Sequence, residues 1–339
     1  MSRLLLFRGA TLNHVRFRTV MHPILNYIEC RTNREPLVVH GVVHGVEMTE
    51  ALRLDSPAKV NLRLEILRRR EDGYHELRTI LQKISLHDTL RFTLKKEKGI
   101  SIKTDHPNLS QGKSNLVYMA AQSILRRSDY KGGIRIEIKK RIPLGAGFGG
   151  GSSNAATTLK ALNRMLTMNL SREKLMEIGL GIGADVPFFF LEGSAIGSGI
   201  GERLKKIELP GLWYVLIYPN FEVSTRWAYQ NFILTKRQFH FKFHKFLETP
   251  EGISHLLMND LEEVVSKEYP QIEVMKKMLY SAGALGSLMT GSGPTVFGIF
   301  SEKGDASKAY QEVRRRVRDK GWTVLMAQSL TPRRGSTPA

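Results

Sequence analysis

The chain has 339 residues, a formal net charge of +19, and 42% hydrophobic residues. This length predicts two packed lobes, and the ordinary apolar fraction excludes a disordered or fibrous chain. The single cysteine, Cys30, excludes an internal disulfide and a cysteine cluster for zinc or iron–sulfur, which favours a reducing compartment such as the cytoplasm. No apolar run reaches the ~20 residues needed to cross a bilayer. The charge predicts an anionic partner, which leaves nucleic acid, a membrane surface and a phosphorylated small molecule as candidates.

Residues 1–53 differ in composition from the rest of the chain. They carry scattered arginines, contain no acidic residue before Glu29, and show no sustained period of a helix or strand. We interpret this stretch as a disordered leader, or as an extension from a start codon that is set too early. A targeting segment and a structural extension are the alternatives. The tail, residues 332–339, is also expected to be disordered.

The regular pattern begins near Ser56. Apolar residues then alternate with polar ones from Val60 to Ile66, which predicts a half-buried strand. Asp72-Gly73 predicts a hairpin turn, and Leu77–Leu86 a second extended segment. Further elements are expected, in chain order, at Ile100–Ile102 (strand), Asn115–Arg127 (helix), Ile134–Ile138 (strand), Asn154–Met168 (helix), Ser171–Leu180 (helix), Tyr214–Tyr218 (strand), Thr295–Phe300 (strand) and Asp305–Lys320 (helix). This irregular alternation predicts an α+β fold of two lobes, with a boundary near residues 209–212.

The strongest local feature is a glycine-rich loop between a predicted strand and a predicted helix. Its residues are Pro143, Leu144, Gly145, Ala146, Gly147, Phe148, Gly149, Gly150, Gly151, Ser152 and Ser153. Glycines let backbone N–H groups approach a ligand without obstruction by Cβ, and the N-terminus of the following helix favours an anion. The sequence is neither a Walker A loop nor a dinucleotide fingerprint. It predicts a cradle for a polyphosphate, with a flexible linker as the alternative.

Two further loops are ambiguous when each is taken alone. Asp185 lies in Gly183-Ala-Asp-Val-Pro187, and it is either a catalytic carboxylate or an ordinary turn residue. The segment Thr290-Gly-Ser-Gly-Pro294 is either a second backbone cradle or an ordinary tight turn.

Polar residues near the first hairpin are equally ambiguous. Lys59 and Asn61 project from the same face of the first strand, ~7 Å apart. They are either part of a site or members of a solvated polar face. Tyr74 and His75 follow the hairpin turn. They either form the wall of a binding site or are ordinary exposed surface residues.

Taken together, these segments resemble the GHMP kinase superfamily. Its three motifs match Ser56-Pro-Ala-Lys-Val-Asn61, Pro143–Ser153 and Leu288-Met-Thr-Gly-Ser-Gly-Pro294. Within the superfamily, Asp72–Leu77 and Gly183–Phe188 are similar to the 4-diphosphocytidyl-2-C-methyl-D-erythritol kinases, ATP-dependent enzymes of the non-mevalonate isoprenoid pathway. The resemblance runs from about residue 54 to residue 330.

The resemblance implies a ribosomal-protein-S5-like N-terminal lobe over residues 54–210 and a ferredoxin-like C-terminal lobe over residues 211–331, with the active site between them. It implies that Asp185 is the general base on the 2-hydroxyl of the substrate and that Lys59 is its electrostatic partner. The glycine loop then surrounds the phosphates of the co-substrate ATP, and Asn115 and Lys140 contact the nucleoside.

The resemblance also implies the contacts of the second substrate, a cytidine diphosphate sugar alcohol. Its cytidine meets Tyr74 and His75, Asn61 and Thr225 hold the methylerythritol or the diphosphate, and Tyr229 is a second stacking aromatic. Mg²⁺ is expected to accompany ATP near Ser152 or Ser153, with no protein ligand assigned. No nucleic acid or membrane partner is expected, and the protein is expected to be a monomer or a homodimer.

Two features depart from the family pattern. Phe148 replaces the leucine that is usual in the glycine loop, and we expect it to turn into the hydrophobic base of that loop. The span Asn231–Thr249, rich in Phe, His and Lys, matches no motif, so substrate contacts from it are not assigned.

Two alternative functions remain from the sequence. Another GHMP activity, such as mevalonate, phosphomevalonate or homoserine kinase, shares the fold but is disfavoured by the Tyr74-His75 pair. A nucleic-acid-binding protein is suggested by the charge and by runs such as Arg314-Arg315-Arg316. It is disfavoured because the basic runs are scattered and no nucleic-acid-binding module is present.

Overall fold

The computed structural model describes residues 51–234 and 246–331, together with the backbone of four short strands before them. Those strands form two separate pairs, β1 (Arg16–His22) with β2 (Leu25–Arg31) and β3 (Val42–Val43) with β4 (Val46–Glu47). Much of the expected leader, the expected tail at 332–339 and the middle of the span 231–249 lie outside the described residues. The expectations about these stretches therefore stay predictions.

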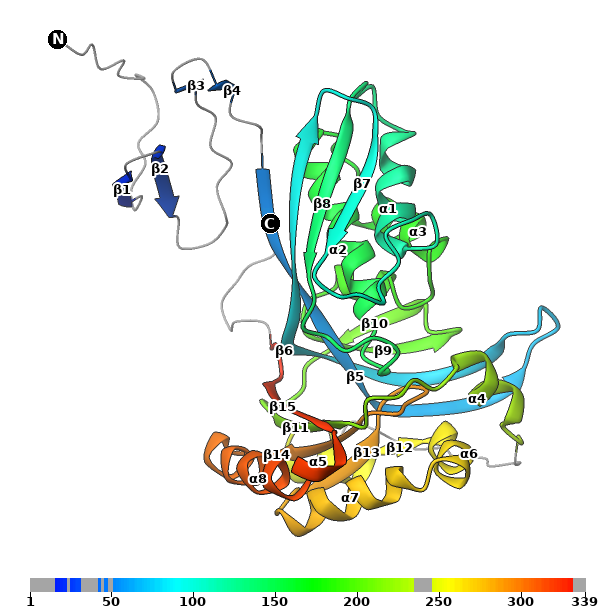
Figure 1. Cartoon of the computed structure of the whole chain (residues 1–339). Helices are drawn as coiled ribbons and strands as arrows, with labels where there is room; N and C mark the ends of the chain where they lie inside the picture. Colours follow the sequence, from blue (N-terminus) through cyan, green and yellow to red (C-terminus); the bar gives the residue numbers. More distant parts are fainter. Residues whose placement is uncertain are drawn as a thin grey trace.

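A long antiparallel hairpin organises the fold. Its strands are β5 (Ala51–Arg69) and β6 (His75–Lys95), which confirms the predicted strand and the turn at Asp72-Gly73. The Asp72 carboxylate fixes that turn by accepting a hydrogen bond from the Tyr74 N–H at 3.1 Å. Figure 1 shows this hairpin as a blue-to-cyan ribbon that passes between an upper group of helices and a lower sheet, with its tip beside α4.

Seven strands form the first sheet. Besides β5 and β6 they are β7 (Gly99–Thr104), β8 (Gly133–Lys139), β9 (Ser194–Gly199), β10 (Arg203–Ile207) and β12 (Met258–Asn259). The order is β10-β9-β6-β5-β12, with β8 paired to the far half of β6 and β7 paired to β8. One face is covered by α1 (Leu116–Leu125), α2 (Gly150–Met165), α3 (Arg172–Leu180) and the short turn η1 (Pro187–Phe190).

The second sheet has four antiparallel strands in the order β13 (Gly286–Met289), β14 (Val296–Phe300), β11 (Trp213–Tyr218), β15 (Thr323–Gln328). The helices around it are α4 (Thr225–Asn231), α5 (Pro250–Leu256), α6 (Asp260–Glu268), α7 (Gln271–Ser281), α8 (Lys303–Arg316) and the short η3 (Arg318–Lys320). The predicted α+β class is confirmed. Several elements, among them β9, β13 and α4 to α7, were not predicted.

The two sheets share a hydrophobic core. Val60 and Leu62 of the hairpin pack with Leu216 and Phe297 of the second sheet, and all four side chains are fully buried. The opposite, polar face of β5 is buried as well, since Lys59, Asn61, Arg63 and Glu65 are only 4–5% exposed. The expectation of a half-buried strand was therefore wrong at this point. Contacts with the glycine-rich loop at Gly147, with Thr79 on β6 and with the carbonyl oxygen of Leu256 at the end of α5 cover the face that a single sheet would leave in water.

Candidate active site

Two hydrogen bonds hold the ammonium group of Lys59 in the middle of β5. Its Nζ donates to Asn61 Oδ1 at 2.5 Å and to the carbonyl oxygen of Gly147 at 2.9 Å. Asn61 is held in turn, because its Nδ2 donates to Thr79 Oγ1 at 2.9 Å. Two residues of one strand face thus form a buried, oriented pair rather than a solvated surface.

Asp185 completes this cluster from the first lobe. Its Oδ2 lies 3.6 Å from Lys59 Nζ, and its side chain is 41% exposed whereas that of Lys59 is 5% exposed. The buried ammonium and the open carboxylate therefore meet at the edge of a water-accessible space. In such a pair the lysine provides fixed positive charge, and the carboxylate is free to accept a proton from an incoming hydroxyl group.

Two lysines hold the turn that comes directly after Asp185. Lys83 Nζ donates to the carbonyl oxygens of Phe189, at 3.1 Å, and of Leu191, and Lys160 Nζ donates to the same Phe189 oxygen at 2.7 Å. Burial lowers the pKa of Lys83 to about 7, with a further contribution from the charge of Lys160, and burial lowers that of Lys160 to about 8. These lysines fix the backbone of η1, immediately after the candidate base.

The glycine loop lies on the other side of Lys59. The Lys59 N–H donates to the carbonyl oxygen of Phe148 at 3.0 Å, so the loop is attached to β5 through its main chain. The Phe148 ring is buried in the core between the sheets, which confirms the expected inward orientation. Gly149 has φ +66° and precedes α2, which begins at Gly150. The helix therefore starts four residues earlier than predicted, because the last glycines of the loop already have helical backbone.

The loop after β13 meets the glycine loop directly. A Cβ on Gly147 would lie only 2.2 Å from the carbonyl oxygen of Thr290, so the two backbones touch at this point. The hydroxyl of Thr290 is buried and accepts a hydrogen bond from the Asn61 N–H at 3.0 Å. We call residues 290–293 the third loop, and its structure is that of a cleft wall rather than of an isolated turn.

The hairpin tip and α4 form a further wall. The ring of His75 stacks on that of Tyr229, with centroids 5.3 Å apart and an interplanar angle of 29°. Burial and the nearby Asp185 charge raise the pKa of Tyr229, so this wall stands close to the Lys59–Asp185 pair. Tyr74 is 60% exposed beside it. At the start of α4, the Thr225 hydroxyl lies 2.9 Å from that of Ser292 in the third loop.

Comparison with known proteins decides the family. Sequence profiles of the GHMP kinases N terminal domain and of the GHMP kinases C terminal domain match residues 115–193 and 244–319. A 4-diphosphocytidyl-2-C-methyl-D-erythritol kinase of Syntrophus aciditrophicus is 48% identical over 261 residues, which cover 76% of this chain and 93% of that protein. One of Geobacter sulfurreducens is 46% identical and covers 78% of this chain and 95% of its own length. The chain belongs to the 4-diphosphocytidyl-2-C-methyl-D-erythritol kinase family.

Solved structures agree with this placement of the kinase. A crystal structure of 4-(cytidine 5′-diphospho)-2C-methyl-D-erythritol kinase has 32% sequence identity and a TM-score of 0.71, and the match covers 83% of this chain and 100% of that one. Homoserine kinase from Cytophaga hutchinsonii matches with a TM-score of 0.66 at 21% identity, which shows a shared fold alone. In the part of this kinase that the structure describes, no helix is long and apolar enough to span a membrane.

Two predicted nucleoside contacts have structural partners in this kinase. Lys140 forms an ion pair with the fully buried Asp88, which also accepts the Ile142 N–H at 2.9 Å. Asn115 is the N-cap of α1, since its Oδ1 accepts the Val117 N–H at 2.9 Å. Both residues brace the elements around the glycine loop, and their contact with a nucleoside stays a prediction.

The two serines of the loop differ. Ser153 is fully buried and its Oγ accepts a hydrogen bond from Ser56 Oγ at 2.7 Å. Ser152 is partly exposed, and its Oγ lies 3.8 Å from the position of a Cβ on Gly183, two residues before Asp185. Of the two serines, only Ser152 is not fully buried, and it lies beside the segment that carries Asp185.

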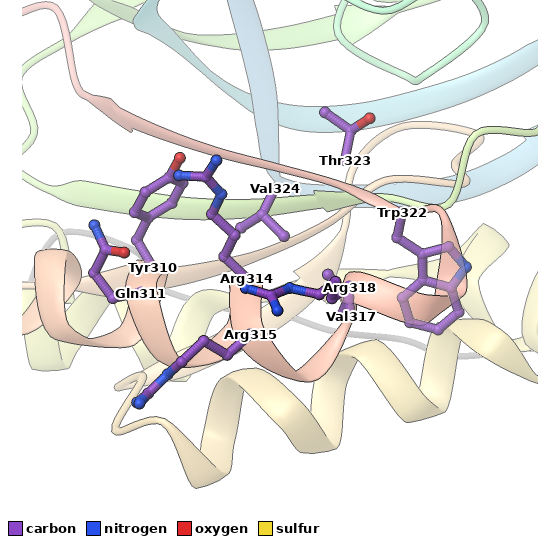
Figure 2. A pocket seen from close by; sticks show the side chains of 9 residues that line it. All are labelled: Tyr310, Gln311, Arg314, Arg315, Val317, Arg318, Trp322, Thr323 and Val324. Atoms are coloured by element: carbon purple, nitrogen blue, oxygen red, sulfur yellow. The ribbon is translucent and has the colours of Figure 1, made fainter.

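A hollow of about 640 Å³ lies elsewhere in the kinase, between α8 and β15 (Figure 2). Its lining includes Arg314, Arg318 and Trp322 and none of the predicted site residues. Figure 2 labels Arg315 among the residues that line the hollow. All three arginines are exposed, and a helix C-terminus favours positive side chains. They fit a solvated surface and do not extend the active site.

Sequence reasoning missed several residues that build the site. Thr79, Lys83, Lys160 and Asn259 carry no motif, and each contacts a partner that is distant in the chain. Thr290 was identified only as part of a loop. The one available signal was the position of this threonine beside the glycines of the third motif.

Proposed function

We propose that this kinase transfers the γ-phosphoryl group of ATP to the 2-hydroxyl of 4-(cytidine 5′-diphospho)-2-C-methyl-D-erythritol, in the non-mevalonate route to isopentenyl diphosphate. The products are the 2-phosphate and ADP. The observation that best supports this is the Lys59–Asp185 pair, 3.6 Å apart, at the junction of the glycine loop and the third loop. The names of the relatives support the choice of substrate.

The reaction needs mainly positioning and charge stabilisation. The Asp185 carboxylate accepts the proton of the 2-hydroxyl as that oxygen bonds to the γ-phosphorus. The bond from the γ-phosphorus to the bridging oxygen breaks, and its electron pair leaves with ADP. Lys59 is held in place by its hydrogen bonds to Asn61 and Gly147. Its positive charge stabilises the negative charge that develops on the transferring phosphoryl group.

The walls of the site have separate binding roles in this proposal. N–H groups of the glycine loop and the N-terminus of α2 bind the ATP phosphates. Tyr74, His75 and Tyr229 bind the cytidine, since a base can stack on such rings. Asn61 and Thr225 face the rest of the acceptor.

Mg²⁺ is part of the proposal, because it accompanies ATP and neutralises phosphate charge when bound. Hydroxyl and carboxylate oxygens are ligands that it accepts, and it commonly keeps waters and phosphate oxygens as the others. Ser152 fits this role, since it is only partly buried and lies beside the segment that carries Asp185. Ser153 does not fit, because its hydroxyl is buried against Ser56.

The mechanistic test is Asp185→Asn, which keeps the shape of the side chain and removes the base. We expect kcat to fall by about 10²- to 10⁴-fold with little change in the KM for ATP. The matched control is Asp305→Asn on α8, an exposed carboxylate far from the cleft, which should leave kcat unchanged. Near-normal turnover of Asp185→Asn contradicts the assignment of the base.

The substrate test is ADP release from ATP with the cytidine diphosphate substrate, beside mevalonate and homoserine. We expect turnover with the first alone. Turnover with either of the other two instead places the protein in a different GHMP activity.

A further inference from the structure

Asn259 is a buried amide that uses both ends of its side chain. It is 7% exposed and lies on β12, which pairs in parallel with β5, directly before α6. Its Oδ1 accepts the Leu261 N–H at 3.0 Å and so caps α6. Its Nδ2 donates to the carbonyl oxygens of Met289 and Gly291, each at 2.8 Å. One side chain therefore connects a helix N-terminus to the third loop.

These bonds fix the direction of two peptide groups. In a trans peptide the C=O and the N–H point in opposite directions. Because the Met289 carbonyl faces Asn259, the Thr290 N–H points the other way, where it donates to the Thr295 oxygen at 2.9 Å. Because the Gly291 carbonyl also faces Asn259, the Ser292 N–H points away from it. This N–H has no hydrogen-bond partner among the described residues.

Gly291 lies against Lys59, one member of the catalytic pair. Gly291 has φ +59°, and a Cβ on it would lie 3.4 Å from Lys59 Nζ and 3.4 Å from Asn61 Oδ1. The end of β13, which leads into the third loop, is also attached to the first turn of α6, because Glu262 Oε2 accepts the Met289 N–H at 2.6 Å. The position of the loop over Lys59 is thus set from α6.

We propose that Asn259 is a positioning residue for phosphoryl transfer: it turns the Gly291–Ser292 peptide so that the Ser292 N–H faces the phosphate beside Lys59. A preorganised backbone N–H stabilises charge that develops on a transferring phosphoryl group. The role requires asparagine, because only an amide offers an acceptor for the helix cap and two donors for the loop. The inference rests on the proposed function of the Lys59–Asp185 site.

The experiment separates the cap from the loop. Asn259→Ser and Asn259→Asp both keep an oxygen that can cap α6, and both lose the N–H donors. Asp also places negative charge against two carbonyl oxygens, so it should be the less stable of the two. For Asn259→Ser we expect kcat to fall by about 10- to 100-fold while the KM for ATP changes less than about threefold, because the glycine loop is untouched.

The control for a simple loss of stability is Ser171→Ala, which removes the N-cap of α3 without touching the third loop. It should lower the melting temperature and leave kcat unchanged. A readout that does not depend on activity is a crystal structure of Asn259→Ser, in which the Gly291–Ser292 peptide should turn over or become disordered.

Two outcomes overturn the inference. One is a folded Asn259→Ser protein with the wild-type kcat, and the other is an unchanged Gly291–Ser292 peptide in its crystal structure. Failure of the proposed function is a different result, because the wild-type protein itself then releases no ADP with the cytidine diphosphate substrate.

Discussion

Two loops rich in glycine and serine face each other across Lys59, and they are stabilised in different ways. The glycine loop continues strand β8, places Phe148 in the core, and ends in its own helix α2. The third loop joins β13 to β14 and is held by side chains from other elements, namely those of Asn259 and Glu262. The first loop is therefore supported by its own sequence neighbours, and the second by residues about 30 positions away.

This difference explains why the glycine-rich loop could be predicted from the sequence more easily than the third loop. A loop framed by an alternating strand and an alanine-rich helix has a local signature, because each neighbour predicts its own structure. A loop fixed by a distant asparagine has the same composition as a common tight turn. A weak local pattern does not mean that a loop lies outside the site, since both loops contact Lys59.

The largest expected effect in this comparison is at the point where the two loops touch. Gly147→Ala places a Cβ within 2.2 Å of the Thr290 oxygen at a residue whose φ is +81°. We expect a loss of stability on the order of 3 kcal/mol, and a fall in kcat/KM of about 10²-fold as the loops separate. Thermal unfolding and steady-state kinetics measure both quantities.

The control for this substitution is Gly304→Ala, where a Cβ meets nothing within 4 Å. It should leave kcat/KM unchanged and should not lower the melting temperature, because alanine is the better helix former. Wild-type kinetics for Gly147→Ala would show that contact between the loops is not needed for turnover.

A smaller effect is expected where the third loop is attached to β5. Thr290→Val keeps the shape of the side chain but leaves the buried Asn61 N–H without its acceptor. Such a loss costs about 1–3 kcal/mol, and we expect kcat to fall by roughly tenfold because Asn61 shifts. Thr290→Ser keeps the hydroxyl and should behave like the wild type. If Thr290→Val and Thr290→Ser have the same kcat and the same stability, the hydrogen bond from the Asn61 N–H to Thr290 does not have this role.

The last effect concerns stability alone, at the Asp185 turn, which resembles the third loop because distant side chains hold it. Burial lowers the pKa of Lys83 from 10.5 to about 7. Between these values the unfolded chain binds more protons at this lysine than the folded chain does, so folding stability rises with pH in this window. Below about pH 7 the full cost of burying the charge is present.

Lys83→Met removes this dependence. The melting temperature of the wild type minus that of the variant should therefore increase from pH 6.5 to pH 9.5, because only the wild type loses the buried charge. Lys160 and Glu192 face the same ammonium and are present in both proteins, so their titration largely cancels in the difference. A difference that stays constant across this range contradicts the lowered pKa.

The parts of the site that could be predicted are those with a local pattern. The first strand was predicted from its alternation, the turn from Asp72-Gly73, and the phosphate loop from its glycines. The start of α2 was placed four residues late, because glycine residues give no helical signal even where the backbone is helical. The polar face of β5 was predicted to be exposed, because the sequence of one strand does not reveal the distant loops that cover it.

The sequence by itself determined the α+β class, the long hairpin and a phosphate loop next to a lysine on a strand. These follow from periodicity and from the φ angles that glycine permits, which act over a few residues. Only the tertiary structure decided that Lys59 lies 3.6 Å from Asp185, that Lys140 pairs with Asp88, and that Asn259 holds the third loop. These contacts join residues that are distant in the chain. The first two form within the first lobe, and the third exists only where β12 of the first sheet lies beside the second sheet.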